Sequence, residues 1–129
     1  MSTPPEVQVL IVEDEEGIRE NLRDLLEDAG YRVAVAADGA AALRELQAHR
    51  PMLVILDLLL PLVSGNELYS VMQKTPGLQS IPVLVTTSDP TASPPGVPIL
   101  AKPIDIEALL RMVALCTHGP DPAYARPRR

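Results

Sequence analysis

Short apolar runs alternate with amphipathic stretches along most of this chain, and this pattern predicts its elements. Apolar runs rich in β-branched residues predict five strands, at Val7–Val12, Arg32–Ala36, Met52–Leu56, Val83–Thr87 and Val97–Ala101. Stretches with apolar residues at helical spacing predict four helices, at Glu16–Ala29, from Asp38-Gly39 to about His49, at Asn66–Lys74, and after Asp105 as the N-terminal cap. Because the strands alternate with helices and the inner strands are nearly all apolar, we expect an α/β fold with a parallel sheet covered on both faces.

The stretch from Ser88 to Pro98 departs from this alternation. A crossover between parallel strands normally takes a dozen or more residues and usually contains a helix. Here only nine residues separate Thr87 from Val97, and three of them are proline, which denies a helix its hydrogen bonds. Nine extended residues reach up to roughly 30 Å. We therefore predict a proline-rich loop without a regular helix.

Polar side chains follow the strands at the edge where ligand sites form in open α/β sheets. Glu13 and Asp14 follow the first strand and Asp57 follows the third. Thr87 ends the fourth strand and Ser88 follows it, and Lys102 follows the fifth. Asp57 is the only charge in the run LVILDLLLPLV, residues 53–63. A buried carboxylate is costly unless it is paired, neutralised or bound to a metal. The sequence thus predicts an acidic pocket that contains a lysine and a hydroxyl.

This set of side chains favours phosphoryl transfer to a carboxylate. Carboxylates about 5 Å apart repel each other by roughly 3 kcal/mol at an effective dielectric constant near 20, so the cluster calls for a cation. Hard oxygen ligands with room for water suit Mg²⁺. A metal and a lysine neutralise an incoming phosphoryl group, and a hydroxyl donates a hydrogen bond to it. Asp57 is the natural nucleophile because apolar residues flank it most closely.

The stretches that carry these residues resemble the response-regulator receiver domain, of the CheY-like superfamily, over roughly residues 7–116. They read LIVEDEEGIRENLRDLLEDAGY, LDLLLPLVSG, IPVLVTTS and LAKP. The resemblance implies a flavodoxin-like, doubly wound sheet of five parallel strands in the order 2-1-3-4-5. The chain departs from the family at the proline-rich loop, which we predict replaces the family's fourth helix.

The resemblance also implies a metal site. Asp57 corresponds to the phospho-accepting aspartate, and Glu13 and Asp14 correspond to the acidic pair, with Asp14 the more direct Mg²⁺ ligand. Leu59 stands where a backbone carbonyl completes the coordination. A plainer interpretation is that Glu13 and Asp14 cap the first helix, whose N-terminus favours negative charge; both roles can hold together.

Two further positions correspond to the family's phosphate-sensing residues. Thr87 matches the switch hydroxyl, with Thr86 as the competing register, and Lys102 matches the lysine that pairs with the phosphoryl group. Lys102-Pro103 resembles the family's cis peptide. Thr87 read alone is an ordinary strand residue, and Lys102 read alone is a solvated lysine. Ile99 stands where the family often has the aromatic residue of its switch.

Composition excludes several other classes of protein. The net charge of −6 and the 2% aromatic content argue against direct nucleic-acid binding. The single cysteine, Cys116, rules out an internal disulfide and is expected to pack in the core. The chain has no apolar run of membrane-spanning length and its start does not resemble a signal peptide. These features predict a cytoplasmic protein without membrane contact.

The domain organisation follows from these patterns. We expect a disordered N-terminus at 1–6, a receiver domain at 7–117, and a flexible tail or linker at 118–129. No output domain follows in the sequence, so the chain is expected to be a stand-alone regulator or a piece of a larger protein.

Two functions stay open at the level of sequence. The first is a signalling receiver that takes a phosphoryl group from a histidine kinase or phosphotransfer protein and then changes its contact with a downstream protein target. It would be a monomer or weak dimer, and no enzyme beyond its own phosphorylation and dephosphorylation. The second is a constitutive interaction module that kept the fold without the switch. A flavodoxin-like cofactor binder is disfavoured, because EDEEG follows the first strand where a phosphate binder needs glycine and amide donors.

Overall fold

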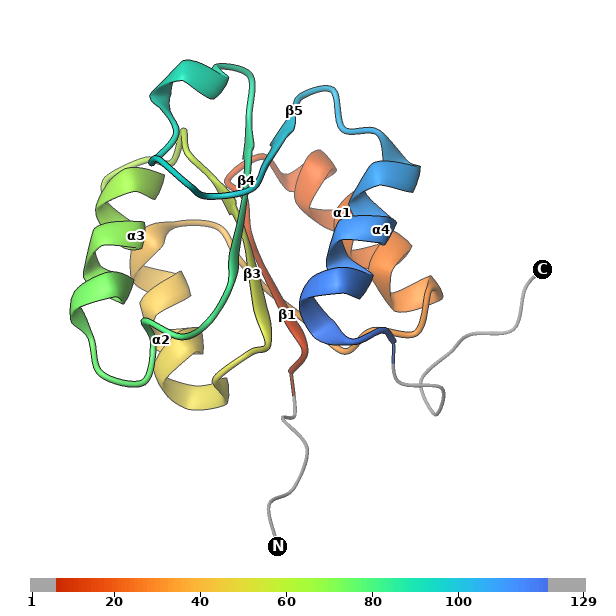
Figure 1. Cartoon of the computed structure of the whole chain (residues 1–129), viewed down its shortest axis with the longest axis horizontal. Helices are drawn as coiled ribbons and strands as arrows, with labels where there is room; N and C mark the ends of the chain where they lie inside the picture. The colour runs from red at the N-terminus through yellow and green to blue at the C-terminus, as the bar shows by residue number, and fades with distance from the viewer. Residues whose placement is uncertain (1–6, 121–129) are drawn as a thin grey trace, which may run out of the picture.

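The computed structural model describes residues 7–120, which form one parallel sheet between two layers of helices (Figure 1). The strands are β1 (Val9–Val12), β2 (Val33–Ala36), β3 (Leu53–Asp57), β4 (Val83–Thr87) and β5 (Ile99–Ala101). The helices are α1 (Glu16–Asp28), α2 (Gly39–His49), α3 (Gly65–Lys74), the short 3₁₀ helix η1 (Pro90–Ala92) and α4 (Ile106–Thr117). The strand order is β2-β1-β3-β4-β5 with all pairs parallel, which confirms the expected doubly wound sheet.

Each face of the sheet has its own apolar core. Figure 1 shows α2 and α3 on one side of the sheet and α1 and α4 on the other. Alternate residues of β3 serve the two cores, with Val54 and Leu56 packing towards α2 and α3, and Leu53 and Ile55 towards α1 and α4. This is why the inner strands read as continuous apolar runs.

Predicted caps begin several of the helices. The Asp105 side chain accepts a hydrogen bond from Ala108 N at the start of α4, as the sequence predicted, and Asp38 caps α2 in the same way. Gly30 follows α1 with φ of 100°, in the left-handed region that favours glycine. The chain therefore turns towards the next strand directly after Ala29, where the predicted helix ends.

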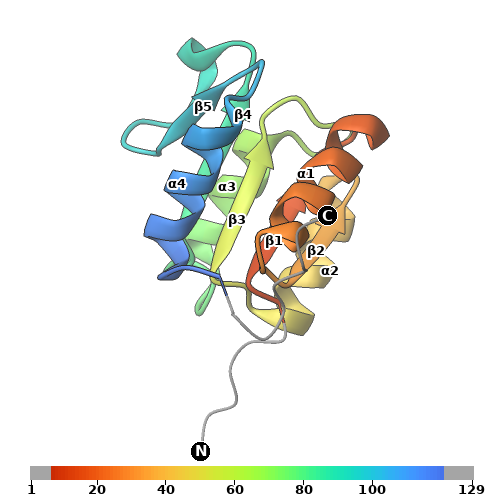
Figure 2. The same ribbon diagram turned by 90° about the vertical axis from the view of Figure 1, so that its right-hand side faces the viewer.

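The crossover from β4 to β5 is the irregular part of the fold. Its only regular element in the described chain is η1, so the predicted absence of an α-helix between these strands is confirmed. The crossover lies at the end of the molecule towards which the β3 arrow points (Figure 2). Val97 and Ile99, at its far end, pack partly buried against the core on the α2 and α3 side.

The remaining differences from the predicted elements are at the ends of strands and, by one residue, of the helices α1 and α3. β1 begins at Val9 and β5 begins at Ile99, each two residues later than predicted. Pro98 precedes β5 and has no N–H to add to the ladder, although its carbonyl accepts from Val85 N at 2.9 Å. Among residues 7–120, no helix has the length and apolar character needed to cross a membrane. The proposed N-terminal segment and most of the proposed tail lie outside the described residues.

Candidate functional site

Glu13 and Asp14 leave the carboxyl end of β1 in different environments. Glu13 is only 2% exposed, and its Oε2 accepts a hydrogen bond from the N–H of Glu15 at 3.2 Å. Asp14 is exposed at the mouth of the pocket. Arg19, one turn into α1, donates from Nη1 to the backbone carbonyls of Glu13 at 3.0 Å and Asp14 at 3.3 Å. The loop is thus held from both sides, and it presents one buried and one exposed carboxylate.

Asp57 is the last residue of β3 and is 3% exposed. Its Oδ1 accepts a hydrogen bond from the N–H of Leu59 at 3.2 Å. The backbone then returns so closely that a Cβ on Gly65 would lie 2.6 Å from both Asp57 O and Leu58 Cα. Gly65 N also donates to Leu58 O at 3.0 Å. Only glycine allows this close approach, which explains why Gly65 follows the acidic position at this spacing.

Lys102, which directly follows the edge strand β5, brings the positive charge to the pocket. Its Nζ lies 2.8 Å from Glu13 Oε1 and 3.4 Å from Asp57 Oδ2. The Lys102-Pro103 peptide bond is cis, as the sequence predicted. Burial lowers the pKa of Lys102, but the hydrogen bond that Lys102 donates to Glu13 and the charge of Asp57 outweigh burial and raise this pKa above its ordinary value of 10.5. The lysine therefore stays charged beside the two buried carboxylates.

The three predicted acids converge on one point. Ligand oxygens of Glu13, Asp14 and Asp57 all lie within 4.8 Å of one another. An all-oxygen set with an exposed member, where water has access, fits Mg²⁺. Leu59 stands at the rim, with its backbone N–H on Asp57 and its side chain 66% exposed. The structure therefore brings together the residues that the sequence assigned to a metal, while the role of the Leu59 carbonyl stays a prediction.

Thr87 is buried, and its hydroxyl is hydrogen-bonded to the backbone of Asp89. The side chain is 1% exposed, and Oγ1 accepts from Asp89 N at 3.0 Å and donates to Asp89 O at 3.3 Å. The neighbouring Thr86 is the register partner of Asp57, and Thr87 follows it at the strand end. Lys102 N donates to Thr87 O at 2.9 Å, which ties this backbone to the lysine.

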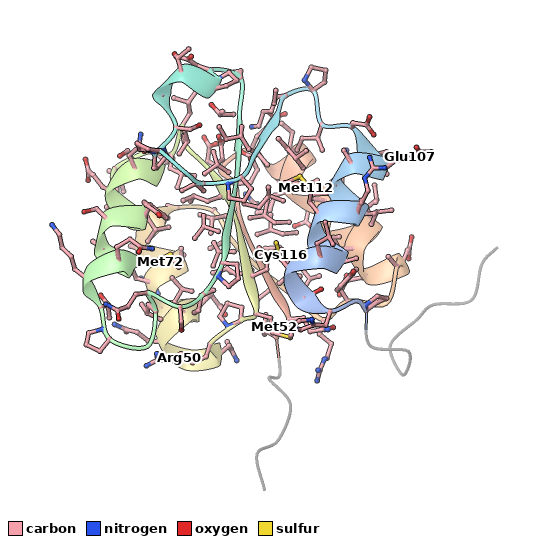
Figure 3. The ribbon with its side chains drawn as sticks, viewed as in Figure 1. Arg50, Met52, Met72, Glu107, Met112 and Cys116 are labelled. Carbon is pink, nitrogen blue, oxygen red and sulfur yellow. The ribbon has the colours of Figure 1, made fainter. Side chains whose placement is uncertain are left out.

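Sequence reasoning missed Arg19 and the hydrogen bond from Asn66 Nδ2 to Ala92 O, at 3.1 Å. Both side chains donate hydrogen bonds to backbone carbonyls, and every residue has such a carbonyl, so the residue types do not indicate these contacts. Arg19 lies on the first turns of α1, where its reach back towards the preceding loop was the available signal. Cys116 lies as expected, packed against the core from α4 and pointing towards the sheet (Figure 3).

An apolar groove opens beside the lysine, between α1 and the segment that leads into α4. Its volume is about 270 Å³. It is lined mainly by Ile18, Asn21, Leu22, Leu25, Lys102, Pro103, Ile104, Ile106 and Leu109. Because Lys102 contributes both to this groove and to the acidic pocket, the groove is an immediate neighbour of the candidate site.

Comparison with known families matches most of the chain to one group of proteins. The family model of the response regulator receiver domain matches residues 9–114. The chain belongs to this family. Receiver domains are signalling modules of two-component systems rather than enzymes in general, and Mg²⁺ binding and phosphorylation are typical of them.

Relatives and solved structures agree with this assignment. Rrf1 of Nitratidesulfovibrio vulgaris is 35% identical over 117 residues, which cover 87% of this chain and 85% of Rrf1. The crystal structure of a putative response regulator from Chloroflexus aurantiacus matches with a TM-score of 0.81 and 31% identity, over 89% of this chain and 99% of that one. Other curated response regulators are longer, and this chain spans 36% of one and 55% of another.

A more distant receiver shares the fold. The receiver domain of the sensor histidine kinase PA1611 from Pseudomonas aeruginosa has a TM-score of 0.79 at 23% identity, over 88% of this chain and 98% of that one. Its crystal structure has a magnesium ion coordinated in the active-site cleft.

Proposed function

We propose that this receiver accepts a phosphoryl group on Asp57 from the phosphohistidine of a histidine kinase or phosphotransfer protein, in a reaction that depends on Mg²⁺. One observation carries this proposal. Three carboxylates converge within 4.8 Å at the carboxyl edge of the sheet, and Lys102 contacts two of them. A merely structural cluster of this kind would be expensive to maintain, since each like-charged pair repels.

The proposed step is a displacement at phosphorus. A carboxylate oxygen of Asp57 forms the new O–P bond while the N–P bond of the donor breaks, and the imidazole nitrogen keeps the electron pair and takes up a proton. The N–H of Leu59 orients the Asp57 carboxylate for this attack. The Nζ of Lys102, 3.4 Å from Asp57 Oδ2, is placed to pair with the phosphoryl oxygens once they arrive.

Glu13, Asp14, Asp57 and the Leu59 carbonyl would hold the Mg²⁺. When bound, the ion neutralises charge on the oxygens of the transferring phosphoryl group. The donor set of this chain supports the assignment, because carboxylate oxygens with an exposed edge suit a hard cation that keeps several waters. The magnesium ion in the cleft of the PA1611 receiver, which shares this fold, is consistent with it.

The apolar groove beside Lys102 is the surface on which we expect the phosphodonor protein to dock. A protein that delivers a phosphoryl group to Asp57 must cover the rim of the acidic pocket, and Lys102 joins that rim to the groove. Half-buried Ile18 and exposed Ile106 offer apolar contacts there. Substituting Ile18 or Ile106 with Ser should slow transfer from a donor protein while leaving phosphorylation by acetyl phosphate unchanged.

Intact mass after incubation with acetyl phosphate tests the proposal. We expect one phosphoryl adduct that requires Mg²⁺, is absent in Asp57→Asn, and persists in the matched control Asp24→Asn. Asp24 is an exposed acid on α1, and its replacement removes one charge without touching the pocket.

The competing function is the constitutive interaction module, which the irregular β4–β5 crossover favours. An adduct dependent on Mg²⁺ and Asp57 excludes it. No adduct with either acetyl phosphate or a phosphohistidine donor, together with no stabilisation by Mg²⁺, would contradict phosphorylation and leave the constitutive module.

A further inference from the structure

The strand β2 forms one edge of the sheet and turns a row of backbone groups outward. Among residues 7–120, its strand neighbour is β1 alone. The carbonyls of Arg32 and Ala36 accept hydrogen bonds, at 3.1 and 3.0 Å, from the first amide of β1 and the amide that follows β1. Because successive residues of a strand turn their N–H and C=O groups to opposite sides, Val33 and Val35 direct theirs away from β1. β2 therefore presents two donors and two acceptors at its open edge.

The two edges of the sheet are protected to different degrees. Edge strands of natural proteins usually carry prolines, charges or bulges that prevent pairing with another chain. β5, at the other edge, has three residues and lies between Pro98 and the Lys102-Pro103 peptide. β2 reads VAVA, with no proline or charge within the strand. Its edge is therefore suited to pairing with a further strand, whereas that of β5 is not.

A groove runs along the open edge of β2. Its volume is about 620 Å³, and β2 contributes Val33, Ala34 and Val35 to its floor. The walls come from α1 and α2, which Figure 2 shows beside β2. None of the residues that line the groove belongs to the acidic pocket. The groove is thus a second surface, separate from the candidate phosphorylation site.

Each wall of the groove carries a basic group and an acid that follow each other along the edge. On α1, Arg23 Nε lies 3.8 Å from Glu27 Oε1, one helical turn away. On α2, His49 Nε2 lies 3.5 Å from Glu45 Oε2 at the same spacing. A two-fold axis perpendicular to the sheet keeps α1 beside α1 and α2 beside α2, and it reverses this order in a second copy. Each acid then faces a basic group of the other copy, so the charges favour a second copy over an unrelated peptide.

We propose that β2 is a dimerisation edge, on which a second copy of this chain adds its own β2 in antiparallel orientation. With the axis at Ala34, Val33 of each copy exchanges backbone hydrogen bonds with Val35 of the other, so all the outward groups are paired. The valines then meet on the α1 face and the Ala34 side chains on the α2 face, where small side chains allow close approach. The interface is isologous. It does not depend on phosphorylation of Asp57.

Sedimentation equilibrium of the full chain tests this proposal. We expect the mean mass to rise from that of one chain towards that of two over about a thousandfold rise in concentration, as mass action requires. Val35→Pro removes an outward N–H and leaves the hydrogen bonds to β1 in place, at a kind of position where edge strands tolerate proline. This variant should associate roughly tenfold more weakly or worse. The matched control, Val35→Thr, keeps the N–H and a β-branched side chain, and it should associate like the wild type.

Charge reversal on α1 tests whether the partner is a second copy. Arg23→Glu places acid against acid in the dimer, and Glu27→Arg places base against base, so each variant alone should associate roughly tenfold more weakly or worse. When the two variants are mixed, the acids of one face the bases of the other. The mixture should therefore associate to within roughly threefold of the wild type. Failure of mixing to restore association would overturn the proposal.

Hydrogen exchange locates the interface. The amides of Val33 and Val35 should exchange more slowly as the concentration rises, because they become hydrogen-bonded only in the dimer. Those of Ala34 and Ala36 are the internal control: they face β1 and should be protected equally at every concentration. A chain that stays monomeric throughout would contradict the proposal. So would a dimer in which the amides of Val33 and Val35 keep their monomer rates.

Discussion

The two walls of the candidate site are built in opposite ways. One wall consists of Glu13, Asp57 and Lys102, which stand at the ends of regular strands and contact one another directly. The other consists of Thr87 and the crossover that follows it, where one hydroxyl and a capped 3₁₀ turn replace a regular helix. The first wall follows the arrangement expected of a receiver, whereas the second departs from it.

The comparison teaches that the chemistry and its readout are separable in this fold. Strand order alone brings the acids and the lysine together, so the pocket persists when a crossover shortens. The crossover, by contrast, determines what a change at Thr87 can move.

The largest expected effect comes from Gly65→Ala. The added Cβ would meet the backbone of Asp57 and Leu58 at 2.6 Å, and backbone atoms cannot swing aside as a flexible side chain would. We expect a loss of about 1–3 kcal/mol in the free energy of unfolding, measured in urea, together with a lower adduct yield.

The matched control is Gly17→Ala on α1, where the nearest atom would lie 3.9 Å away. This change should stabilise the protein by up to about 1 kcal/mol through helix propensity. Equal stabilities for Gly65→Ala and the wild type would show that the close approach at Asp57 is unimportant.

The next effect is expected from Lys102→Met. Removing the ammonium leaves Glu13 buried without its cation, so the free energy of unfolding without Mg²⁺ should fall by about 1–3 kcal/mol. This loss is smaller than for a fully buried ion pair, because the lysine is partly exposed to solvent. Mg²⁺ affinity should rise roughly tenfold in titration calorimetry, since the ion no longer meets a positive neighbour. Phosphorylation should be slower.

The pH dependence of the same pair has a definite sign. The carboxylates raise the pKa of Lys102 in the folded protein above 10.5, so its stabilising contribution is complete at neutral pH and is lost as the pH rises through the raised value. The stability difference between wild type and Lys102→Met should therefore shrink only in strong alkali.

The matched control for Lys102→Met is Lys74→Met, at an exposed lysine of α3, which should change neither stability nor metal affinity.

The smallest effect is expected at the rim, from Leu59→Asn. The N–H of Leu59 binds Asp57, so its side chain starts at the edge of the pocket, where an apolar group offers no partner to an attacking water. An amide there can hold such a water, and we expect phosphate release from the phosphorylated protein to accelerate roughly threefold. A phosphate-release time course with no change would remove this role for Leu59.

Leu62→Asn is the control for Leu59, since Leu62 lies on the same loop and is 92% exposed. It should leave the release rate unchanged. Its φ of 68° lies in the left-handed region, which asparagine tolerates better than leucine, so this variant should gain up to about 1 kcal/mol in stability.

The sequence was most informative where residue type and strand position coincide. Asp57 in an apolar run, Glu13-Asp14 after β1 and Lys102 before Pro103 could be located because parallel strands end at one edge of the sheet. The irregular crossover was predictable too, because nine residues with three prolines leave no room for a helix.

Side-chain contacts to backbone groups could not be predicted from residue type and strand position. Arg19 holds the carbonyls of Glu13 and Asp14, and Asn66 holds that of Ala92, yet a carbonyl acceptor is the same at every position of the chain. The exchange of hydrogen bonds between Thr87 and Asp89 was hidden in the same way. A rule that places a threonine at a strand end does not say to which side its hydroxyl turns.

Site localisation of the phosphoryl group tests the central claim most directly. Borohydride reduces an aspartyl phosphate to homoserine, which peptide sequencing by mass spectrometry detects at a single residue. After incubation with a phosphohistidine donor and Mg²⁺, we expect homoserine at position 57 and nowhere else. Reduction at position 14, or a phosphoryl adduct that survives in Asp57→Asn, would contradict the assignment of Asp57 as the acceptor.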